Sequence, residues 1–581
     1  MSEEKMVASG IGKVFEHRKN YIVIGLTGRT GGGCSTAAKI LSTQHYNQLN
    51  LPSINNPPKS HEDRKQRIIS LWADEHWQGF RIINVTAIIL SLALREDAAD
   101  FLDYLTRENS SLSEDKLKNF FVEYSDSARY SLGIANDIEN ASDDSEIKIA
   151  AEFLSVKADN LARDFKSLFG DDLSAYTKTL QGIGNNLRRS GKAFDSEPLP
   201  DSLFLMPKTI ANAAEVYRRE MKLRGVDKKY IVIDALRHPY EIRYLSGRIS
   251  SFYTVAVSTS DDERRRRLHD LQMNKGQIES LDEMEYPDKI SGANDYSILV
   301  KQNIQACLEL ADIYISNLGN GDSSRKELTR QLVRYVSLMQ HPGLITPTAE
   351  ERCMQSAIVA KANSGCISRQ VGAVVTDEFY SIKAIGWNDV PQGQVPCLLR
   401  NVKHLITGTY DQIAYSGYEL ENENFQEIVI SQYSNKESLN GRNLSYCFKS
   451  AYTKTSDKLA NNQVHTRSLH AEENAFLQIA KYGGEPLKKG FLFTTASPCE
   501  LCAKKAYQLG ISKIFFIDPY PGIASTHILN SGFNRPKLEI FQGAVRSAYH
   551  DLYQPVMAYK DELMSLIAGK EEKIGNNEQL D

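Results

Sequence analysis

Short apolar runs alternate with longer amphipathic stretches through the first half of the chain. Residues 21–26, 229–234, 251–258 and 311–317 are rich in Ile, Val and Tyr, and each run ends at polar or turn-forming residues. Runs of this length and composition predict buried β-strands. Residues 98–200 instead have a charged, helical pattern. Alternating strands and helices predict an α/β sheet that is interrupted by a long helical insertion.

The pattern breaks at residues 341–348, where two prolines and a glycine occur close together. A Thr and a Glu with capping-box spacing then predict a helix over residues 350–362. Apolar residues 371–376 and 381–388 predict two strands joined by a short turn, and residues 490–495 predict a further strand. A second α/β domain with its own sheet is therefore expected.

A chain of 581 residues is too long for one ordinary hydrophobic core. We expect a first domain over residues 1–340 with its insertion at about 98–200. A second domain should cover residues 341–570, and its polar insertion at about 401–464 is long enough to suggest a functional segment. Residues 571–581, rich in Glu, Asn and Gly, predict a flexible tail.

Composition and charge restrict the class of protein. Hydrophobic residues make up 41% of the chain and charged residues 24%, as in ordinary globular proteins, and no apolar run is long enough to span a bilayer. The first residues lack the apolar core of a secretory signal, and the eight cysteines fit metal binding and core packing better than disulfides. These features predict a cytoplasmic protein. A formal net charge of −4 favours free nucleotides over long nucleic acid as partners.

The second domain contains a candidate metal site. His470 precedes Cys499 and Cys502, and Glu472 follows the histidine by two positions. One His and two Cys can hold zinc with a coordination position left for water, and a nearby Glu can move the protons of a hydrolytic deamination. The Cys pair alone could also be a redox pair or half of a structural zinc site. The preceding His and Glu, and the strand that leads into Pro498, favour the catalytic interpretation.

A glycine-rich segment follows the first predicted strand and enters a helix, which is the context of a phosphate-binding P-loop. Cys34 stands where the loop lysine is expected, so phosphate binding remains a prediction and phosphoryl transfer becomes doubtful. Asp234 ends a later strand where a Mg²⁺-holding Asp would lie, which predicts binding of a Mg²⁺-nucleotide. Residues 264–267 are four arginines that could cover bound phosphates or form a solvated helix face. The candidate loop residues are Gly28, Gly31, Gly32, Gly33, Cys34, Ser35 and Thr36.

Four ordered segments carry a resemblance to a known family. Residues 366–373, 386–391, 470–475 and 498–502 resemble, in that order, the sequence blocks of deoxycytidylate deaminases. The fusion of such a domain to a P-loop domain without the loop lysine resembles bacterial antiphage deoxycytidylate deaminases. The resemblance implies an N-terminal P-loop kinase-like parallel sheet with a helical insertion. It also implies a C-terminal cytidine-deaminase-like α/β/α domain with a mixed sheet.

The same resemblance implies a function and its partners. The enzyme would convert dCTP or dCMP to dUTP or dUMP and ammonia with catalytic Zn²⁺, and would deplete dCTP during phage infection. The P-loop domain would regulate it through a bound nucleotide. A homo-oligomer is also implied, with no membrane partner. An inhibitory RNA or another regulator is compatible with the family, but the sequence does not identify one.

Individual residues take roles from this resemblance. Asn388 would contact the sugar and base, and the backbone amide of Ala471 would meet the pyrimidine oxygen. Asn474 would lie at the pocket edge or on the helix surface. Tyr520 would pack on the base or fill the core.

A second, structural Zn²⁺ is also suggested by the resemblance, with Cys366, Cys397 and His465 as ligands. The fourth ligand is not evident from the sequence, with Cys447 and His404 as alternatives, and buried free thiols remain an equal interpretation.

Two other functions remain open. The chain could be a housekeeping dCMP deaminase of pyrimidine salvage fused to an active nucleotide kinase. It could also edit cytidines in RNA or single-stranded DNA, although the acidic charge balance disfavours this. The sequence does not determine how many phosphates the substrate carries.

Overall fold

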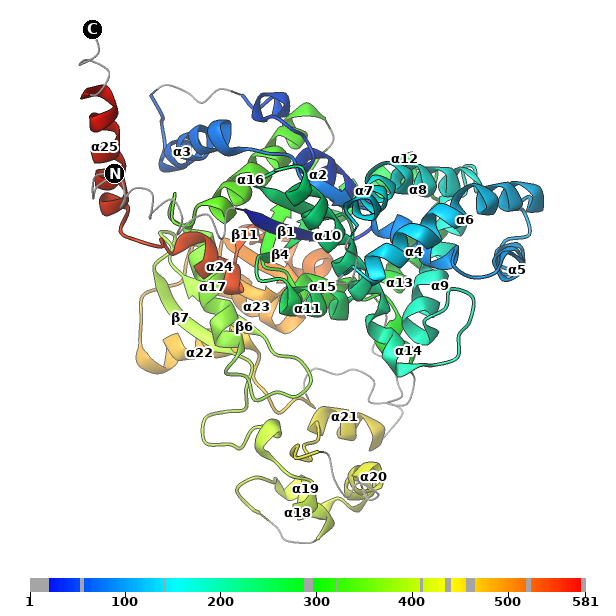
Figure 1. Ribbon diagram of the computed structural model, residues 1–581. Coiled ribbons are helices and arrows are strands. Elements are labelled where there is room, and N and C mark those ends of the chain that lie inside the picture. Colours follow the sequence, from blue (N-terminus) through cyan, green and yellow to red (C-terminus); the bar gives the residue numbers. More distant parts are fainter. Residues whose placement is uncertain are drawn as a thin grey trace. The chain divides into compact units, whose positions relative to one another are not determined.

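The chain divides into two compact units, of which the first is built from two separate stretches of sequence (Figure 1). The first unit comprises residues 1–346 and 547–581, and the second comprises residues 347–546. The computed structural model describes residues 20–52, 57–138, 143–286, 296–319, 321–407, 411–433, 440–455, 465–518 and 524–575.

The first unit contains a sheet of parallel strands. Neighbouring strands run in the order β5-β4-β1-β3-β2, and every pair among them is parallel. Strand β1 is apolar along nearly its whole length, and Ile22, Val23, Ile24 and Leu26 are buried. Such uniform burial is typical of a parallel strand that is covered on both faces. The strands are β1 (Tyr21–Thr27), β2 (Arg81–Ile83), β3 (Lys229–Ile233), β4 (Phe252–Ser258) and β5 (Ile313–Ser316).

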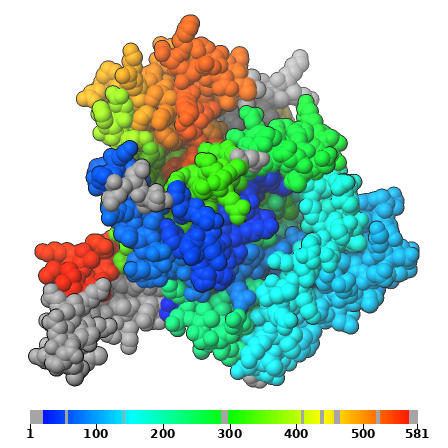
Figure 2. Space-filling view, turned by 90° about the horizontal axis from the view of Figure 1, so that it is seen from above, coloured from blue at the N-terminus to red at the C-terminus, as the bar shows by residue number. Residues whose placement is uncertain are grey.

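Helices occupy most of the chain between β2 and β3, where the sequence predicts a helical insertion. A large apolar cluster runs through them, including Phe101, Phe120 and Phe165. In the space-filling view the middle of this stretch, coloured light blue to cyan, forms one continuous mass (Figure 2). The helices are α4 (Val85–Ala93), α5 (Ala98–Glu108), α6 (Glu114–Asn136), α7 (Asp144–Glu152), α8 (Ala158–Ser167), α9 (Leu173–Ser190) and α10 (Leu205–Leu223).

Further helices of the first unit follow its other strands. Among all the helices that the structure describes, none is long and apolar enough to cross a membrane. The further helices of the first unit are α2 (Cys34–Leu41), α3 (His61–His76), α11 (Pro239–Arg248), α12 (Asp261–Asp270), α13 (Lys275–Glu285), α14 (Ser297–Val300), α15 (Ile304–Leu310) and α16 (Asp322–Gln340).

The end of the chain returns to the first unit. After α24 (Arg546–Tyr553), helix α25 (Tyr559–Gly575) contributes Glu562, whose Oε1 lies 2.7 Å from Nε2 of the buried His341. Residues 571–575, in the first part of the predicted flexible tail, are the last residues of this helix. Their Glu and Lys residues favour helix over coil. Residues 576–581 lie outside the described part of the chain.

The second unit contains a mixed sheet with the strand order β10-β9-β8-β6-β7. Strand β6 is antiparallel to both of its neighbours, whereas β8, β9 and β10 run parallel. This is a mixed α/β architecture, as the sequence predicts. The elements are β6 (Gly372–Thr376), β7 (Ile382–Trp387), β8 (Phe491–Ala496), β9 (Lys513–Asp518), β10 (Lys537–Ile540), β11 (Gly543–Ala544), α17 (Ala349–Lys361), α22 (Ala471–Tyr482) and α23 (Glu500–Gln508).

The polar insertion of the second unit has a small core of its own. Phe425, Val429 and Tyr446 are buried in it together with other apolar residues. Arg400 and Glu419 form a fully buried ion pair there, and the guanidinium of Arg400 lies 4.8 Å from the ring of Tyr446. Its helices are α18 (Lys403–Ile406), α19 (Gly417–Glu421), α20 (Glu423–Tyr433) and α21 (Phe448–Tyr452).

Candidate active site

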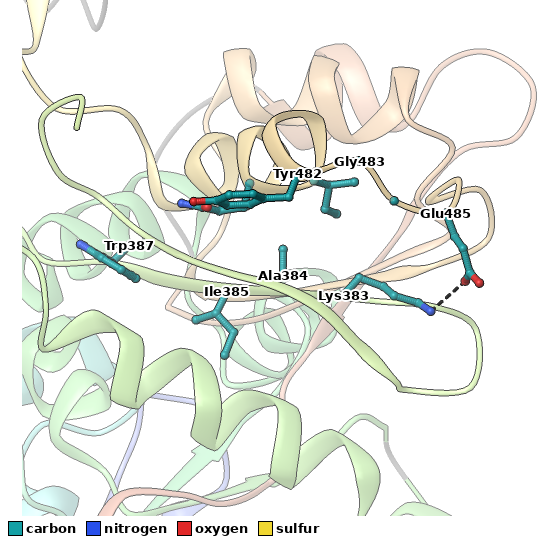
Figure 3. A pocket seen from close by; sticks show the side chains of 10 residues that line it. Lys383, Ala384, Ile385, Trp387, Tyr482, Gly483 and Glu485 are labelled. Atoms are coloured by element: carbon teal, nitrogen blue, oxygen red, sulfur yellow. Dashed lines mark hydrogen bonds and ion pairs between the residues drawn. The ribbon is translucent and has the colours of Figure 1, made fainter. Parts of the chain in front are cut away.

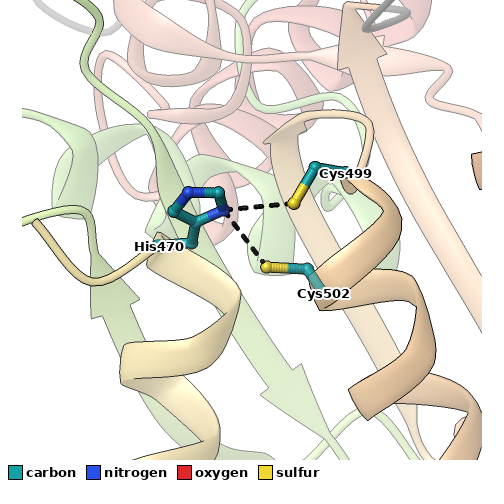
Figure 4. Close-up of side chains that lie close together, drawn as sticks. All are labelled: His470, Cys499 and Cys502. Carbon is teal, nitrogen blue, oxygen red and sulfur yellow. Dashed lines mark hydrogen bonds between the residues drawn. The ribbon is translucent and has the colours of Figure 1, made fainter. Parts of the chain in front are cut away.

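Two helix starts in the second unit bring His470, Cys499 and Cys502 together (Figure 4). His470 is the N-cap of α22 and Cys499 is the N-cap of α23. The Nδ1 atom of His470 lies 3.3 Å from Sγ of Cys499 and 3.4 Å from Sγ of Cys502. Among the described residues, these three form the one group whose ligand atoms could jointly hold a metal ion.

Close packing of α22 on strand β7 sets the position of His470. A Cβ atom at Gly386 of β7 would lie 2.3 Å from the carbonyl oxygen of Ala471 and 2.5 Å from the backbone nitrogen of Ala475. Only glycine allows this approach without displacement of the helix. The cysteine pair is positioned by β8, which leads through Pro498 into α23.

The three side chains suit zinc in donor chemistry and in charge. Hydrogen bonding from Cys502 lowers the pKa of Cys499 to about 4, and His470 acts in the same direction. The partner Cys502 has a raised pKa because it donates to Cys499 and is buried. Two sulfurs and an imidazole nitrogen are donors that zinc prefers, and three protein ligands leave one position open. The residues therefore fit a catalytic zinc ion.

Glu472 lies in the first turn of α22, directly after the metal-site histidine and Ala471. Its side chain is 4% exposed, and its Oε1 lies 3.1 Å from the hydroxyl oxygen of Thr494. Burial raises the pKa of the Glu472 carboxyl group, which favours its protonated form. Thr494 is a site residue that the sequence interpretation missed, although it lies in the strand that precedes the cysteine pair.

The predicted substrate residues have structural partners in this conformation. The Asn388 amide group bridges two backbone groups, because it donates to the carbonyl of Arg369 at 2.7 Å and accepts from the amide of Val371 at 2.6 Å. Asn474 donates to the carbonyl of Trp387 at 2.9 Å, which joins α22 to the end of β7.

The other two predicted substrate residues are Ala471 and Tyr520. Ala471 is fully buried and begins α22 beside His470. Tyr520 lies outside the described residues.

The predicted second zinc site is not assembled within the described residues. Cys366, Cys397 and His465 are not brought into one ligand group, and both cysteines are free thiols. The ring of His465 instead packs against Tyr452 at 4.6 Å between ring centroids. Residue type suggested this site, but sequence spacing does not determine whether distant ligands meet.

A separate hollow of about 370 Å³ lies between β7 and the end of α22 (Figure 3). Trp387, Tyr482 and the ion pair between Lys383 and Glu485, 2.8 Å long, lie around it. None of the predicted metal or substrate residues lines it.

In the first unit, the glycine-rich loop connects β1 to α2 in a conformation that requires glycine. Gly31 and Gly33 have φ angles of 85° and 114°, and a Cβ atom at Gly33 would lie 2.2 Å from the Asn317 side-chain nitrogen. Cys34 is the first residue of α2. Residues of this loop, including Ser35 and Thr36, line a cavity of about 750 Å³. Nucleotide binding in this cavity remains a prediction.

Asp234, the predicted Mg²⁺ ligand, follows β3 but does not line that cavity. Its Oδ1 accepts a hydrogen bond of 2.9 Å from the backbone amide of Val85, and burial raises its pKa to about 6. In this conformation Asp234 therefore joins the end of β3 to the start of α4.

The four arginines of α12 do not act as one set. Arg264 is 1% exposed and pairs with Asp282 at 2.7 Å and Glu285 at 3.2 Å. Arg267 donates to the carbonyl of Gly31 at 3.2 Å, whereas the side chains of the two arginines between them are 43% and 49% exposed. The first and last arginines of the run therefore contact the loop, and Arg267 also lines the cavity, so a role of these side chains at bound phosphates stays a prediction.

Part of the second unit is similar in sequence to known proteins. Residues 347–518 match the sequence model of the cytidine and deoxycytidylate deaminase zinc-binding region. The chain is 29% identical over 204 residues to the deoxycytidylate deaminase of Enterobacteria phage T2, which covers 32% of this chain and 91% of that protein. It is 28% identical over 179 residues to the deoxycytidylate deaminase of Enterobacteria phage T4, covering 29% of this chain and 76% of that protein.

Among solved structures, the apo dCMP deaminase of cyanophage S-TIM5 is similar at 21% identity, covering 34% of this chain and 100% of that chain with a TM-score of 0.20. A score this low adds no argument about the fold. The match of residues 347–518 to the deaminase zinc-binding region lies within the second unit.

Proposed function

We propose that the chain catalyses zinc-dependent hydrolytic deamination of deoxycytidine nucleotides, so that dCMP or dCTP yields dUMP or dUTP and ammonia. The observation that carries this proposal is the convergence of His470, Cys499 and Cys502 beside the buried Glu472. The match of residues 347–518 to the deaminase zinc-binding region supports it independently.

The side chains divide the chemistry between them. His470, Cys499 and Cys502 would hold the metal, and zinc at such a site supplies Lewis-acid activation of water. Glu472 would accept a proton from that water, deliver it to the ring nitrogen and then protonate the departing amino group. Burial suits this work, because a carboxyl group with a raised pKa holds a proton more readily. Thr494 would hold the Glu472 carboxylate in place through its hydroxyl group.

The substrate can be identified with purified, zinc-loaded protein. We would incubate it separately with dCMP, dCTP, CMP and a cytosine-containing oligonucleotide, and measure ammonia and the uracil product. We expect turnover of a deoxycytidine nucleotide. Turnover of the oligonucleotide alone would contradict the proposal and favour nucleic-acid editing.

We further propose that the enzyme is a cytoplasmic homo-oligomer that depletes dCTP as a defence against phage, and that the first unit regulates it by binding a nucleotide. The support is that the deaminase region needs only part of the chain, while the first unit contains a glycine-rich loop beside a large cavity. Regulation of this kind needs two distinct sites with a coupling free energy between them.

A housekeeping dCMP deaminase fused to a nucleotide kinase is the second candidate, favoured by the similarity to phage deoxycytidylate deaminases. Cys34, in place of the loop lysine, counts against an active kinase. Incubation with dCMP and ATP distinguishes the candidates, because rapid formation of dCDP would favour salvage.

A further inference from the structure

The cavity beside the glycine-rich loop lacks the lysine that normally contacts phosphates. Cys34 holds the position, and burial raises the pKa of its thiol to about 12, so this side chain is uncharged near neutral pH. The loop amides and the start of α2 still attract anions. Binding of a highly charged phosphate chain would nevertheless need a cation from elsewhere in the fold.

Arg237 brings a positive charge to this place from the turn that follows β3. It lines the same cavity as Cys34. Its charge also acts on the Cys34 thiol, whose pKa it lowers against the larger effect of burial. Arg237, which is distant from the loop in the sequence, therefore brings a positive charge to the cavity that the loop lines.

The Arg237 guanidinium is held in place from one side. One of its terminal nitrogens donates to the hydroxyl of Thr30 at 2.8 Å and to the fully buried carboxylate of Glu285 at 3.0 Å. The side chain remains 27% exposed, and Glu285 does not line the cavity. Glu285 and Thr30 thus hold the Arg237 guanidinium, while the partly exposed side chain lines the cavity.

The other cavity arginines differ in how their charge is used. Arg29 is paired with Asp261 at 2.7 Å and Asp282 at 2.6 Å. Arg267 forms an ion pair with Glu263 at 2.8 Å and donates hydrogen bonds to carbonyl groups of the loop.

Arg325, near the start of α16, also lines the cavity. It has no ion-pair partner among the described residues. Arg237 shares the single charge of Glu285 with Arg264 and Arg29. The charge of Arg325, and the part of the Arg237 charge that Glu285 does not neutralise, are therefore available to a ligand.

We propose that this cavity binds the phosphate chain of a nucleoside polyphosphate, with Arg237 in place of the missing loop lysine and Arg325 as a second cation. The inference rests on the nucleotide-binding role proposed above and specifies its ligand chemistry and residues. A volume of about 750 Å³ is in the range of small-molecule sites. Fixed guanidinium groups suit phosphate, because their planar donors match its oxygens.

The test uses the full-length, zinc-loaded protein in calorimetric titrations with ATP, inorganic tripolyphosphate and adenosine. None of these carries cytosine, so none should occupy the deaminase site. We expect ATP and tripolyphosphate to bind and adenosine not to bind, since the phosphates are recognised. Affinity for ATP far above that for tripolyphosphate would identify a nucleotide, and equal affinities would identify the phosphate chain alone as the ligand.

Substitutions of Arg237 and Arg325 test whether these side chains contact the phosphate chain. Arg237→Gln should weaken binding of ATP and tripolyphosphate at least tenfold, and Arg325→Gln should weaken it less, because that arginine is not fixed. Arg243→Gln is the matched control, since Arg243 is an exposed arginine of α11 that does not line the cavity. Addition of Cys34→Lys to Arg237→Gln should restore binding, because it returns the charge to the loop itself.

The outcomes separate this inference from the proposal on which it rests. Equal binding by the wild type and Arg237→Gln would overturn the role of Arg237 and leave the nucleotide site standing. Absence of binding to the wild type would overturn both. Ammonia release from dCMP by the same preparations reports on the second unit independently of either result.

Discussion

Glu472 combines burial with a hydrogen-bonding partner, Thr494, at the start of a helix whose N-cap is a candidate metal ligand. We expect Glu472→Gln to retain one zinc per chain and to lose activity by a factor on the order of 10²–10⁴, because the amide fills the same space but cannot shuttle protons. Ammonia release and metal analysis by mass spectrometry measure the two effects. Activity near that of the wild type would remove Glu472 from the mechanism.

The metal ligands should behave differently from Glu472. Cys499→Ser and His470→Ala should lose both zinc and activity, because three protein ligands are the minimum for this kind of site. Cys366→Ser is the control, since this free thiol belongs to no ligand group in the described structure. Stoichiometric zinc in Cys499→Ser would mean that the ligand set is wrong.

His238 makes the stability of the first unit depend on pH. It is 1% exposed, and burial, with a smaller effect of Arg188, lowers its pKa to about 3. The unfolded chain binds a proton near pH 6.5 and the folded chain does not, so stability is lost as the pH falls from about 6.5 towards 3. Between pH 6.5 and 5 this amounts to about 2 kcal/mol.

The variant His238→Asn tests this effect. Asn can still cap α11, as His238 does by accepting from the Tyr240 amide at 3.3 Å. Urea unfolding of the first unit should therefore show a smaller loss of stability between pH 6.5 and 5 in the variant than in the wild type. Identical losses would mean that His238 does not titrate in this way.

At the scale of elements, the contact of β7 with α22 joins the sheet to the catalytic helix. Gly386→Ala would place a methyl group against the backbone of α22, which cannot yield as a flexible side chain can. We expect about 1–3 kcal/mol lower stability and weaker zinc binding, because the helix that carries His470 must shift. Chemical unfolding and zinc titration measure both.

Gly417→Ala is the matched control for this variant. The nearest atom to a Cβ atom at Gly417 would be in the Glu421 side chain, at 3.6 Å, which is an ordinary van der Waals contact. A normal zinc affinity in Gly386→Ala, together with normal stability, would show that the helix tolerates the shift.

Elements whose signals are local could be predicted from the sequence. The helix predicted over residues 350–362 is found as α17, because Thr348 and Glu351 form a capping box that is complete within four residues. The strand and the helix around the cysteine pair were likewise predictable from an apolar run, a proline and the spacing of two cysteines. Each of these signals acts between neighbours in the chain.

Features that depend on distant contacts could not be predicted. The buried pairing of Arg264 with Glu285 joins α12 to the end of α13, so the arginine run alone did not reveal it. The core of the polar insertion depends on Arg400, Glu419 and Tyr446 meeting across separate short elements. For Cys366 and Cys397 the residue type suggested zinc, but within the described part of the chain they belong to no ligand group.

At the scale of the whole molecule, the defence proposal predicts a change in nucleotide pools. Bacteria that express the protein should show a sharp fall in dCTP and a rise in dUMP or dUTP upon phage infection, measured by mass spectrometry of cell extracts. Cells that express Glu472→Gln should show neither change and no protection. A constant dCTP pool in infected cells that contain folded, zinc-loaded protein would favour housekeeping salvage.

The division of the first unit into two stretches of sequence has a consequence for protein synthesis. The ribosome completes residues 347–546, and with them all three candidate zinc ligands, before it makes the helix that supplies Glu562 to His341. The second unit can therefore fold as a continuous nascent chain while the first still waits for its last helix. A translation product that stopped after residue 546 would carry every side chain of the candidate active site but would lack the contact of Glu562 with His341.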